Sequence, residues 1–460
     1  MTLQAYNPDQ TLLAQYRSAT VIGLGATGYS VVRYLRAHGL QVSVLDSRSE
    51  PPMAAMLADT HPEVAAKFGE FESANLLDVE LIISSPGVGL REPMLQSAKQ
   101  AGAHIVGDVE LFLQENQKPI IAITGSNGKS TVTTLVGKMI EAGGLTPNVA
   151  GNIGKPVLDT LTDSMAYDVA VLELSSFQLE TISQLPCESA AILNISADHM
   201  DRYDSMGDYV LAKARILRGA RRAILPRHDE QLKQITRVAE LLSFDLDEPA
   251  NDAEFGLLRK SGNRWLMKGQ TRLMKLREVP LTGLHNVKNI LSAFALVDFL
   301  NLPLEKLVDA VKSFKGLTHR MQSVAVNDSV TWVNDSKATN IGATSTALRN
   351  LESPIVWIAG GQGKGADFTE LRDAITDNLK LLILIGEDAG KIEAALDGQA
   401  PIMHAEDMLD AVTRASQHAE QGSVVLLSPA CASFDMFGDF AQRGKAFADA
   451  VKKVTARGAK

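Results

Sequence analysis

Residues 119–131 read PIIAITGSNGKST, and this stretch decides the fold of the chain. Its apolar run, Ile120–Ile123, has the composition of a buried strand, and a helical pattern follows from Ser130 to Ala142. Backbone N–H groups of a glycine turn between such a strand and helix can surround a phosphate chain. Lys129 and Ser130, which follow the turn, can reach phosphate oxygens and Mg²⁺. The strict Walker pattern has a glycine where this chain has Ile123, but the glycine–lysine–hydroxyl core is intact, so we predict ATP binding.

The same local arrangement, an apolar run followed by a glycine turn and a helix-like segment, occurs at 20–28 (TVIGLGATG) and at 354–365 (PIVWIAGGQGKG). Continuous apolar runs are typical of parallel strands that are covered by helices on both faces. The spacing between the three units is the size of a domain. We therefore predict an α/β protein of three domains, residues 1–107, 108–316 and 317–460. Short alternating runs between residues 243 and 281 predict β-hairpins inside the second domain.

The first glycine turn has the complete G-x-G-x-x-G pattern, formed by Gly23, Gly25 and Gly28. Asp46 closes the next predicted strand, 42–45, where dinucleotide-binding folds place an acid that binds ribose. One interpretation is a dinucleotide site, and therefore an oxidoreductase. The other is a structural turn that only joins a strand tightly to a helix. The pattern favours a nucleotide diphosphate site but does not indicate which nucleotide.

Acidic residues and a histidine follow two further predicted strands. Glu173 ends the strand at 170–172, and Asp198 and His199 follow the strand at 190–195. Ligands in α/β folds bind at the carboxyl ends of strands, so Glu173 and His199 are candidate ligands of Mg²⁺. A lone histidine is more often a packing or capping residue, and only its position favours the functional interpretation.

Composition limits the classes of function. The chain has 460 residues and a net charge of −9, which argues against nucleic acid as the main partner. We expect no membrane insertion and no secretion signal, because no stretch is long and apolar enough to span a bilayer and the first residues lack a basic start. Two cysteines, Cys187 and Cys431, are too few for a disulfide framework. We therefore expect a cytoplasmic enzyme.

With these residues identified, the chain resembles the Mur ligase family over essentially its whole length. The resemblance is carried by TGSNGKST (124–131), GNIG (151–154), ELSSFQLE (173–180), DHMDRY (198–203), the asparagines of 285–289, THR (318–320), NDSKATN (334–340) and SPACASFDMF (428–437). The last two are similar to the members that add D-glutamate. The resemblance implies a Rossmann-like N-terminal domain, a central P-loop ATPase-like domain and a Rossmann-like C-terminal domain. It also implies ATP-dependent addition of D-glutamate to UDP-N-acetylmuramoyl-L-alanine in cytoplasmic peptidoglycan precursor synthesis, with the first glycine turn holding UDP rather than NAD.

The resemblance further implies a role for each matching residue. The catalytic set would be Lys129, Glu173, His199, Lys213 and Arg320. One Mg²⁺ would be held by Ser130 and Glu173, and a second by His199 and Lys213, with Lys213 as a carbamate made from CO₂. From the sequence alone, Lys213 would be a solvated lysine on a helix. The ATP site would comprise Gly125, Ser126, Asn127, Gly128, Lys129, Ser130, Thr131, Asn286, Asn289, Arg320 and Asp335.

The two other sites follow in the same way. The site for the UDP-linked substrate would comprise Ala26, Thr27, Asp46, Ser47, Arg48, Ser85, Gly87, Asn152, Ser175 and His199. The D-glutamate site would comprise Thr339, Lys364, Ser433, Phe434 and Phe440. We expect a monomer. The alternatives are a nicotinamide-dependent oxidoreductase, an ATP-gated scaffold, a sibling ligase for another amino acid and a folylpolyglutamate synthase-like enzyme.

Overall fold

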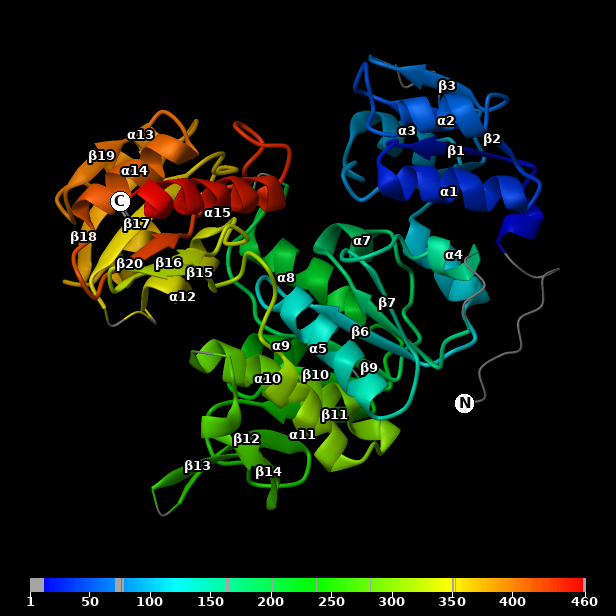
Figure 1. Cartoon of the computed structure of the whole chain (residues 1–460). Helices are drawn as coiled ribbons and strands as arrows, with labels where there is room; N and C mark the ends of the chain where they lie inside the picture. Colours follow the sequence, from blue (N-terminus) through cyan, green and yellow to red (C-terminus); the bar gives the residue numbers. More distant parts are fainter. Residues whose placement is uncertain are drawn as a thin grey trace. The chain divides into compact units, whose positions relative to one another are not determined.

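A computed structural model describes residues 12–70, 76, 78–162, 166–200, 202–236, 238–260, 262–281, 283–349, 351 and 353–457. Asp201 of the DHMDRY motif lies outside these residues. So do the first eleven residues of the predicted first domain and the last three residues of the predicted third domain. The chain forms three sheets (Figure 1) and divides into two compact units. One unit is Met1–Asn194, Gly207–Pro280 and Asn286–Phe314, and the other is Ile195–Met206, Leu281–His285 and Lys315–Lys460. The three sheets confirm the predicted α/β architecture of three domains, and most of the first two domains falls in one compact unit.

The N-terminal sheet is parallel and has the strand order β3-β2-β1-β4-β5. Its elements are β1 (Ser18–Ile22), α1 (Ala26–Ala37), β2 (Gln41–Asp46), α2 (Ala54–Thr60), β3 (Ala65–Phe68), β4 (Leu81–Ser84), α3 (Pro93–Gln100) and β5 (His104–Val106). The strand order reverses at β1, where β2 and β4 flank the strand that leads into the glycine turn. In open α/β sheets, a reversal of this kind is where ligands bind.

The middle sheet has the order β14-β13-β12-β11-β10-β9-β6-β8-β7. Its elements are α4 (Asp108–Glu115), β6 (Ile120–Thr124), α5 (Lys129–Ala142), β7 (Pro147–Gly151), α6 (Asp159–Thr162), β8 (Val169–Glu173), α7 (Ser176–Glu180), β9 (Ser189–Ile192), α8 (Met206–Ala214), β10 (Arg222–Pro226), α9 (Glu230–Ile235), β11 (Glu240–Phe244), β12 (Glu254–Lys260), β13 (Asn263–Lys268), β14 (Thr271–Lys275), α10 (Leu284–Val297) and α11 (Leu304–Ser313). The predicted hairpins are confirmed, because β12, β13 and β14 pair antiparallel at one end of this sheet (Figure 1). The predicted strand at 190–195 is shorter than expected and ends at Ile192.

The C-terminal sheet has the order β15-β16-β20-β17-β18-β19, with β15 antiparallel at one edge. Its elements are β15 (Gln322–Asn327), β16 (Val330–Asn334), α12 (Ile341–Arg349), β17 (Ile355–Gly360), β18 (Leu379–Ile385), α13 (Ala389–Leu396), β19 (Ile402–His404), α14 (Met408–His418), β20 (Val424–Leu427) and α15 (Phe440–Arg457). All six residues of β17 are buried, because α12 and α13 pack on one face of the sheet and α14 and α15 on the other. The continuous apolar run PIVWIAG is thus explained by two covered faces. None of the described helices combines the length and apolar composition that crossing a membrane requires.

Candidate active site

The phosphate loop joins β6 to α5, as predicted. Gly125 and Gly128 have φ angles of +151° and +84°, which side chains other than glycine rarely adopt. Gly128 is also the residue before α5, and no side chain caps this helix. The N–H groups at the start of α5 are therefore directed at the loop, where they can bind an anion.

Asn194 holds this loop in shape. Its Oδ1 accepts from the backbone N–H of Asn127 at 2.8 Å, its Nδ2 donates to the Asn127 carbonyl at 2.9 Å, and its own carbonyl accepts from the N–H of Ser126 at 3.0 Å. Sequence analysis assigned no role to Asn194. It follows the shortened strand β9, next to β6 in the sheet, so the pairing of these strands brings it to the loop.

Two lysines donate to one carbonyl oxygen of the loop. The Nζ atom of Lys129 lies 2.7 Å from the oxygen of Gly125, and the Nζ atom of Lys213 lies 3.0 Å from the same oxygen. Lys213 is 2% exposed, and its ammonium group lies 4.7 Å from the centre of the Tyr209 ring. The expectation of a solvated Lys213 is therefore wrong: α8 turns this side chain into the protein at the phosphate loop. Two ammonium groups that share one acceptor, one of them buried, are an unusual arrangement that points to a functional role.

Glu173 ends β8, which pairs with β6 so that Glu173 is opposite Ile123, two residues before Gly125. The side chain is 1% exposed. Its Oε1 accepts from Nδ2 of Asn152 at 2.8 Å, whereas Oε2 is buried and has no hydrogen-bond partner among the described residues. A buried carboxylate oxygen without a donor is costly in a folded protein, and a cation is the ligand that would satisfy it. The carboxylate thus fits the role predicted for it in binding Mg²⁺.

Helix α10 brings two of the predicted ATP contacts to the phosphate loop. Asn289 is buried, and its Nδ2 donates to Oδ1 of Asn286 at 3.3 Å. A Cβ atom at Gly128 would lie 2.5 Å from Oδ1 of Asn289, so only a glycine there allows this close approach. Between the two asparagines, Lys288 forms an ion pair with Asp245 at 2.6 Å, which ties α10 to the end of β11.

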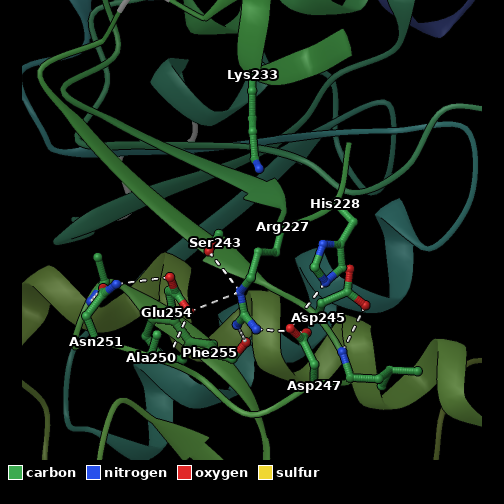
Figure 2. A network of polar contacts seen from close by, with 12 residues as sticks. Arg227, His228, Lys233, Ser243, Asp245, Asp247, Ala250, Asn251, Glu254 and Phe255 are labelled. Carbon is green, nitrogen blue, oxygen red and sulfur yellow. Dashed lines mark hydrogen bonds and ion pairs between the residues drawn. The ribbon is translucent and has the colours of Figure 1, made fainter. Parts of the chain in front are cut away.

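A larger polar network close to Asp245 is centred on Arg227 (Figure 2). The guanidinium of Arg227 lies 2.8 Å from Asp247, 3.3 Å from Glu254 and 2.6 Å from the carbonyl of Phe255. Arg227 follows β10, so this network joins the ends of three neighbouring strands. The charge of Arg227 is balanced by ion pairs with Asp247 and Glu254, and we assign the network a structural role.

The first glycine turn is as tight as its pattern predicts. A Cβ atom at Gly28 would lie 1.9 Å from the carbonyl oxygen of Gly23. Ser85, predicted for the same site, donates from Oγ to that oxygen at 2.9 Å. Five more of the residues predicted for this site lie at the same edge of the N-terminal sheet: Ala26 and Thr27 begin α1, Ser47 and Arg48 follow β2, and Gly87 follows β4. Asn152 and Ser175 follow strands of the middle sheet, and His199 belongs to the second unit.

Asp46 organises this turn from within. Its carboxylate is 2% exposed and accepts from the N–H of Leu24 at 2.7 Å and from Arg48 through the backbone N–H and two guanidinium nitrogens at 2.6–2.9 Å. Burial opposes ionisation of Asp46, but the hydrogen bonds from Arg48 and Leu24 prevail and hold the pKa of its carboxyl below the ordinary value. Ser175 also has a structural task, because its Oγ caps α7 by accepting from the N–H of Gln178 at 3.1 Å.

Asp198 is the centre of a polar group in the second unit. It lies 3.6 Å from Nε2 of His199, 3.0 Å from Nδ2 of Asn340 and 3.5 Å from Nζ of Lys364. His199 has a φ angle of +57°, a strained conformation that is often found at functional sites. Asp198 was predicted to follow a strand together with His199, but no separate role was expected for it. Its links to Asn340 and Lys364 cross more than a hundred residues of sequence and could not be predicted from it.

Asp335 follows β16 and is buried with its neighbours. Oδ2 accepts from Oγ of Ser428 at 2.9 Å, and Oδ1 accepts from the backbone N–H of Met321 at 3.1 Å. Burial raises the pKa of the Asp335 carboxyl to about 7, although these hydrogen bonds and the charge of Arg320 favour its ionised form. A carboxyl group with this pKa can change its charge near neutrality.

The five residues predicted to bind D-glutamate all belong to the second unit. They lie after the strands β16, β17 and β20, whose carboxyl ends share one edge of the C-terminal sheet. Ser433 is 2% exposed and Phe434 is 69% exposed. Phe440 begins α15, and the ammonium of Lys337 lies 3.6 Å from the centre of its ring. Thr339 and Lys364 complete the set.

The predicted residues thus form two groups, one in each unit. Lys129, Ser130, Glu173, Lys213 and Asn289 belong to the first unit, and His199, Arg320 and Asp335 belong to the second. Within the described part of the chain, no three histidine, cysteine or acidic side chains cluster as a metal-binding group. The first group places a lysine, the N–H groups at the start of a helix and a buried carboxylate at the phosphate loop, which suits a nucleotide phosphate chain with a divalent cation.

Comparison with known proteins accounts for nearly the whole chain. The family model "Mur ligase MurD-like, N-terminal domain" matches residues 17–107, "Mur ligase middle domain" matches 123–297, and "Mur ligase, glutamate ligase domain" matches 319–431. The UDP-N-acetylmuramoylalanine–D-glutamate ligase of Pseudomonas aeruginosa is 44% identical over 449 residues, covering 96% of this chain and 100% of that protein. The enzyme of the same name from Thiobacillus denitrificans is 46% identical over 464 residues, covering 96% and 97%.

Solved structures show the same fold at lower identity. A pseudomurein peptide ligase type C from Methanothermus fervidus matches with a TM-score of 0.61 and 16% identity, covering 95% of this chain and all of that one. The UDP-N-acetylmuramate–alanine ligase of Thermotoga maritima matches with a TM-score of 0.59 and 19% identity over the same shares. On the family models and the near-full-length relatives, the chain belongs to the Mur ligase family.

Proposed function

We propose that this chain is an ATP-dependent amide ligase that adds D-glutamate to UDP-N-acetylmuramoyl-L-alanine in peptidoglycan precursor synthesis. Relatives named UDP-N-acetylmuramoylalanine–D-glutamate ligase are 44–46% identical and cover 95–96% of this chain. The structural observation that carries the proposal is the phosphate loop with Lys129 on it and the buried carboxylate of Glu173 in the neighbouring strand. This arrangement supplies the parts that phosphoryl transfer from ATP requires.

In the proposed reaction, the L-alanyl carboxylate attacks the γ-phosphorus of ATP, and ADP leaves. The resulting acyl phosphate is attacked by the amine of D-glutamate, and the tetrahedral adduct expels phosphate to leave an amide. Both the nucleophile and the phosphate chain are anions, so the first step needs positive charge at the reacting atoms. Lys129 and the N–H groups at the start of α5 supply such charge on one side, and Arg320 is proposed to supply it from the second unit. Water would destroy the acyl phosphate, so the proposed reaction requires the reacting atoms to be shielded from solvent.

For the metal, we propose one Mg²⁺ held by Ser130 and Glu173 and a second held by His199 and the carbamate of Lys213. Bound Mg²⁺ would offset the negative charge of the transferring phosphoryl group. The orphaned Oε2 atom of Glu173 supports the first site. The burial of Lys213 beside Lys129 supports the carbamate, because carbamylation would replace one of two neighbouring positive charges with an oxygen ligand.

The remaining assignments are part of the same proposal. The turn around Gly23–Gly28 would hold the UDP group, with Asn152 and Ser175 nearer the middle of that substrate, and the loops after β16, β17 and β20 would hold D-glutamate. We propose domain limits of 1–107, 108–316 and 317–460, which are supported by family models that begin and end inside them. We also propose that the protein is a cytoplasmic monomer, because its composition and the proposed reaction suit that compartment.

The test is phosphate release from ATP with Mg²⁺ and bicarbonate, measured with UDP-N-acetylmuramoyl-L-alanine and one amino acid at a time, with the product identified by mass. We expect release that requires both the nucleotide substrate and D-glutamate. Lys129→Ala should reduce kcat by about a hundredfold or more. Lys138→Ala, a change of an exposed lysine on the same helix, should leave kcat unchanged. Phosphate release that requires an amino acid other than D-glutamate would reject the proposed substrate. No phosphate release with any amino acid would reject the proposed reaction.

A further inference from the structure

Arg443 lies in the first turn of α15 and is 1% exposed. The start of a helix carries a partial positive charge, so a buried cation is unfavourable there unless other groups compensate for it. Burial lowers the pKa of its guanidinium to about 10, which still leaves it charged at neutral pH. Neither the sequence motifs nor the proposed mechanism assigns this residue a role.

The guanidinium is compensated by oxygen atoms of two loops. Nε donates to Oγ of Ser336 at 3.0 Å, and Nη2 donates to the Ser336 carbonyl at 2.9 Å. Nη2 also donates to the carbonyl of Cys431 at 3.0 Å, and Nη1 donates to that of Ala432 at 3.1 Å. Ser336 follows β16 and the other two follow β20, which is its neighbour in the sheet. The planar fork of arginine can make such contacts in two directions at once, which a lysine cannot do.

The same contacts reach a third loop. The Ala432 carbonyl that accepts from Arg443 also accepts from the backbone N–H of Gln362 at 3.0 Å, and Ala432 donates back to Gln362 at 2.8 Å. Gln362 follows β17. Gly361 beside it has a φ angle of +128°, and a Cβ atom there would lie 2.2 Å from the Ala432 oxygen and 3.2 Å from Nη1 of Arg443. The three loops therefore meet around the guanidinium without space for another side chain.

These three loops and the start of α15 carry all five residues proposed to bind D-glutamate. Ser433 follows Ala432 directly, Lys364 lies two residues after Gln362, and Thr339 lies three residues after Ser336. Oγ of Ser336 donates to the carbonyl of Phe440 at 2.8 Å, which fixes the start of α15 to the same group. We propose that Arg443 is a positioning residue that holds the amino-acid site in its binding geometry without touching the substrate. The inference rests on the proposed function and adds to it the group that preorganises the D-glutamate site.

The test compares Arg443→Met and Arg443→Lys with the wild type in the phosphate-release assay, with each substrate varied in turn. We expect Arg443→Met to raise the KM for D-glutamate by roughly tenfold or more, because charge-assisted hydrogen bonds to three loop carbonyls are lost. Arg443→Lys should give an intermediate value, since it keeps the charge but loses the fork. The KM values for ATP and for the nucleotide substrate should stay within about twofold. Arg414→Met is the matched control, because Arg414 is a partly exposed arginine on α14, which packs on the same sheet. It should change none of the three KM values.

Parallel changes in all three KM values and in kcat would mean a general structural role and would overturn the inference. So would an unchanged KM for D-glutamate in both Arg443 variants. If Arg443→Met does not fold, as judged by its thermal transition, Ser336→Ala removes only the two hydrogen bonds of Oγ, to Arg443 and to Phe440, and should raise the D-glutamate KM alone, by a smaller factor. A wild type without D-glutamate-dependent release would reject the proposed function itself, so the two failures are distinguishable.

Discussion

Replacing Glu173 with glutamine should make the metal-free protein more stable and less responsive to Mg²⁺ at the same time. Oε2 of this carboxylate is buried without a hydrogen-bond partner among the described residues, and Oε1 accepts from Asn152 at 2.8 Å. A buried polar group without a partner costs about 1–3 kcal/mol, and more when it is charged. Glutamine keeps the shape and the acceptor for Asn152 and exchanges the buried charge for a neutral amide, whose unpaired N–H groups cost less than an unpaired charge. For a unit of roughly 300 residues, this gain corresponds to a rise in Tm of about 2–5 °C.

The assay is thermal unfolding in a chelating buffer, followed by the Mg²⁺ dependence of phosphate release. The Mg²⁺ concentration for half-maximal activity should rise by about tenfold to a hundredfold in Glu173→Gln, because a metal ligand has become neutral. Glu141→Gln, which changes an exposed carboxylate on α5, should alter neither quantity. A metal-free Glu173→Gln protein that is less stable than the wild type, with an unchanged Mg²⁺ requirement, would refute the reasoning.

Two further predictions concern the turn and the buried acid. Gly28→Ala should lower the free energy of unfolding by about 1–3 kcal/mol in denaturant titrations, because its Cβ would lie 1.9 Å from the Gly23 oxygen, whereas Gly25→Ala meets no atom within 4 Å and should change little. Equal effects of the two substitutions would contradict this. Asp335 has its pKa raised by burial to about 7, so its folded form keeps a proton that the unfolded chain loses near pH 4. The stabilisation by this protonated group is complete below pH 4 and is lost as the pH rises to 7. Between these values, the free energy of unfolding of the wild type should fall by up to about 1.4 kcal/mol per pH unit relative to that of Asp335→Asn. Parallel stability curves for the two proteins would exclude this linkage.

Local patterns in the sequence were sufficient for the strands, turns and helices that carry the nucleotide sites. The apolar run at 120–123 is β6, and the helix predicted from Ser130 begins one residue earlier, at Lys129. The strand predicted at 190–195 was too long, because Asn194 hydrogen-bonds the phosphate loop rather than a neighbouring strand. Apolar composition could not predict this, since the partner lies 67 residues away.

The three α/β sheets, the two glycine turns and the chemical identity of the candidate ligands could all be predicted from the sequence. These depend on continuous apolar runs, glycine spacing and short motifs, which act between residues that are close along the chain. Only the tertiary structure shows which charged side chains are buried and which distant segments surround them. Lys213 is buried because α8 packs its side chain against the loop carbonyl of Gly125, 88 residues away. Arg443 is enclosed by loops from three strands, since parallel strands bring their carboxyl ends to one edge whatever their separation in sequence. Burial and charge at these positions arise from packing between distant segments, and that packing is set by the whole fold.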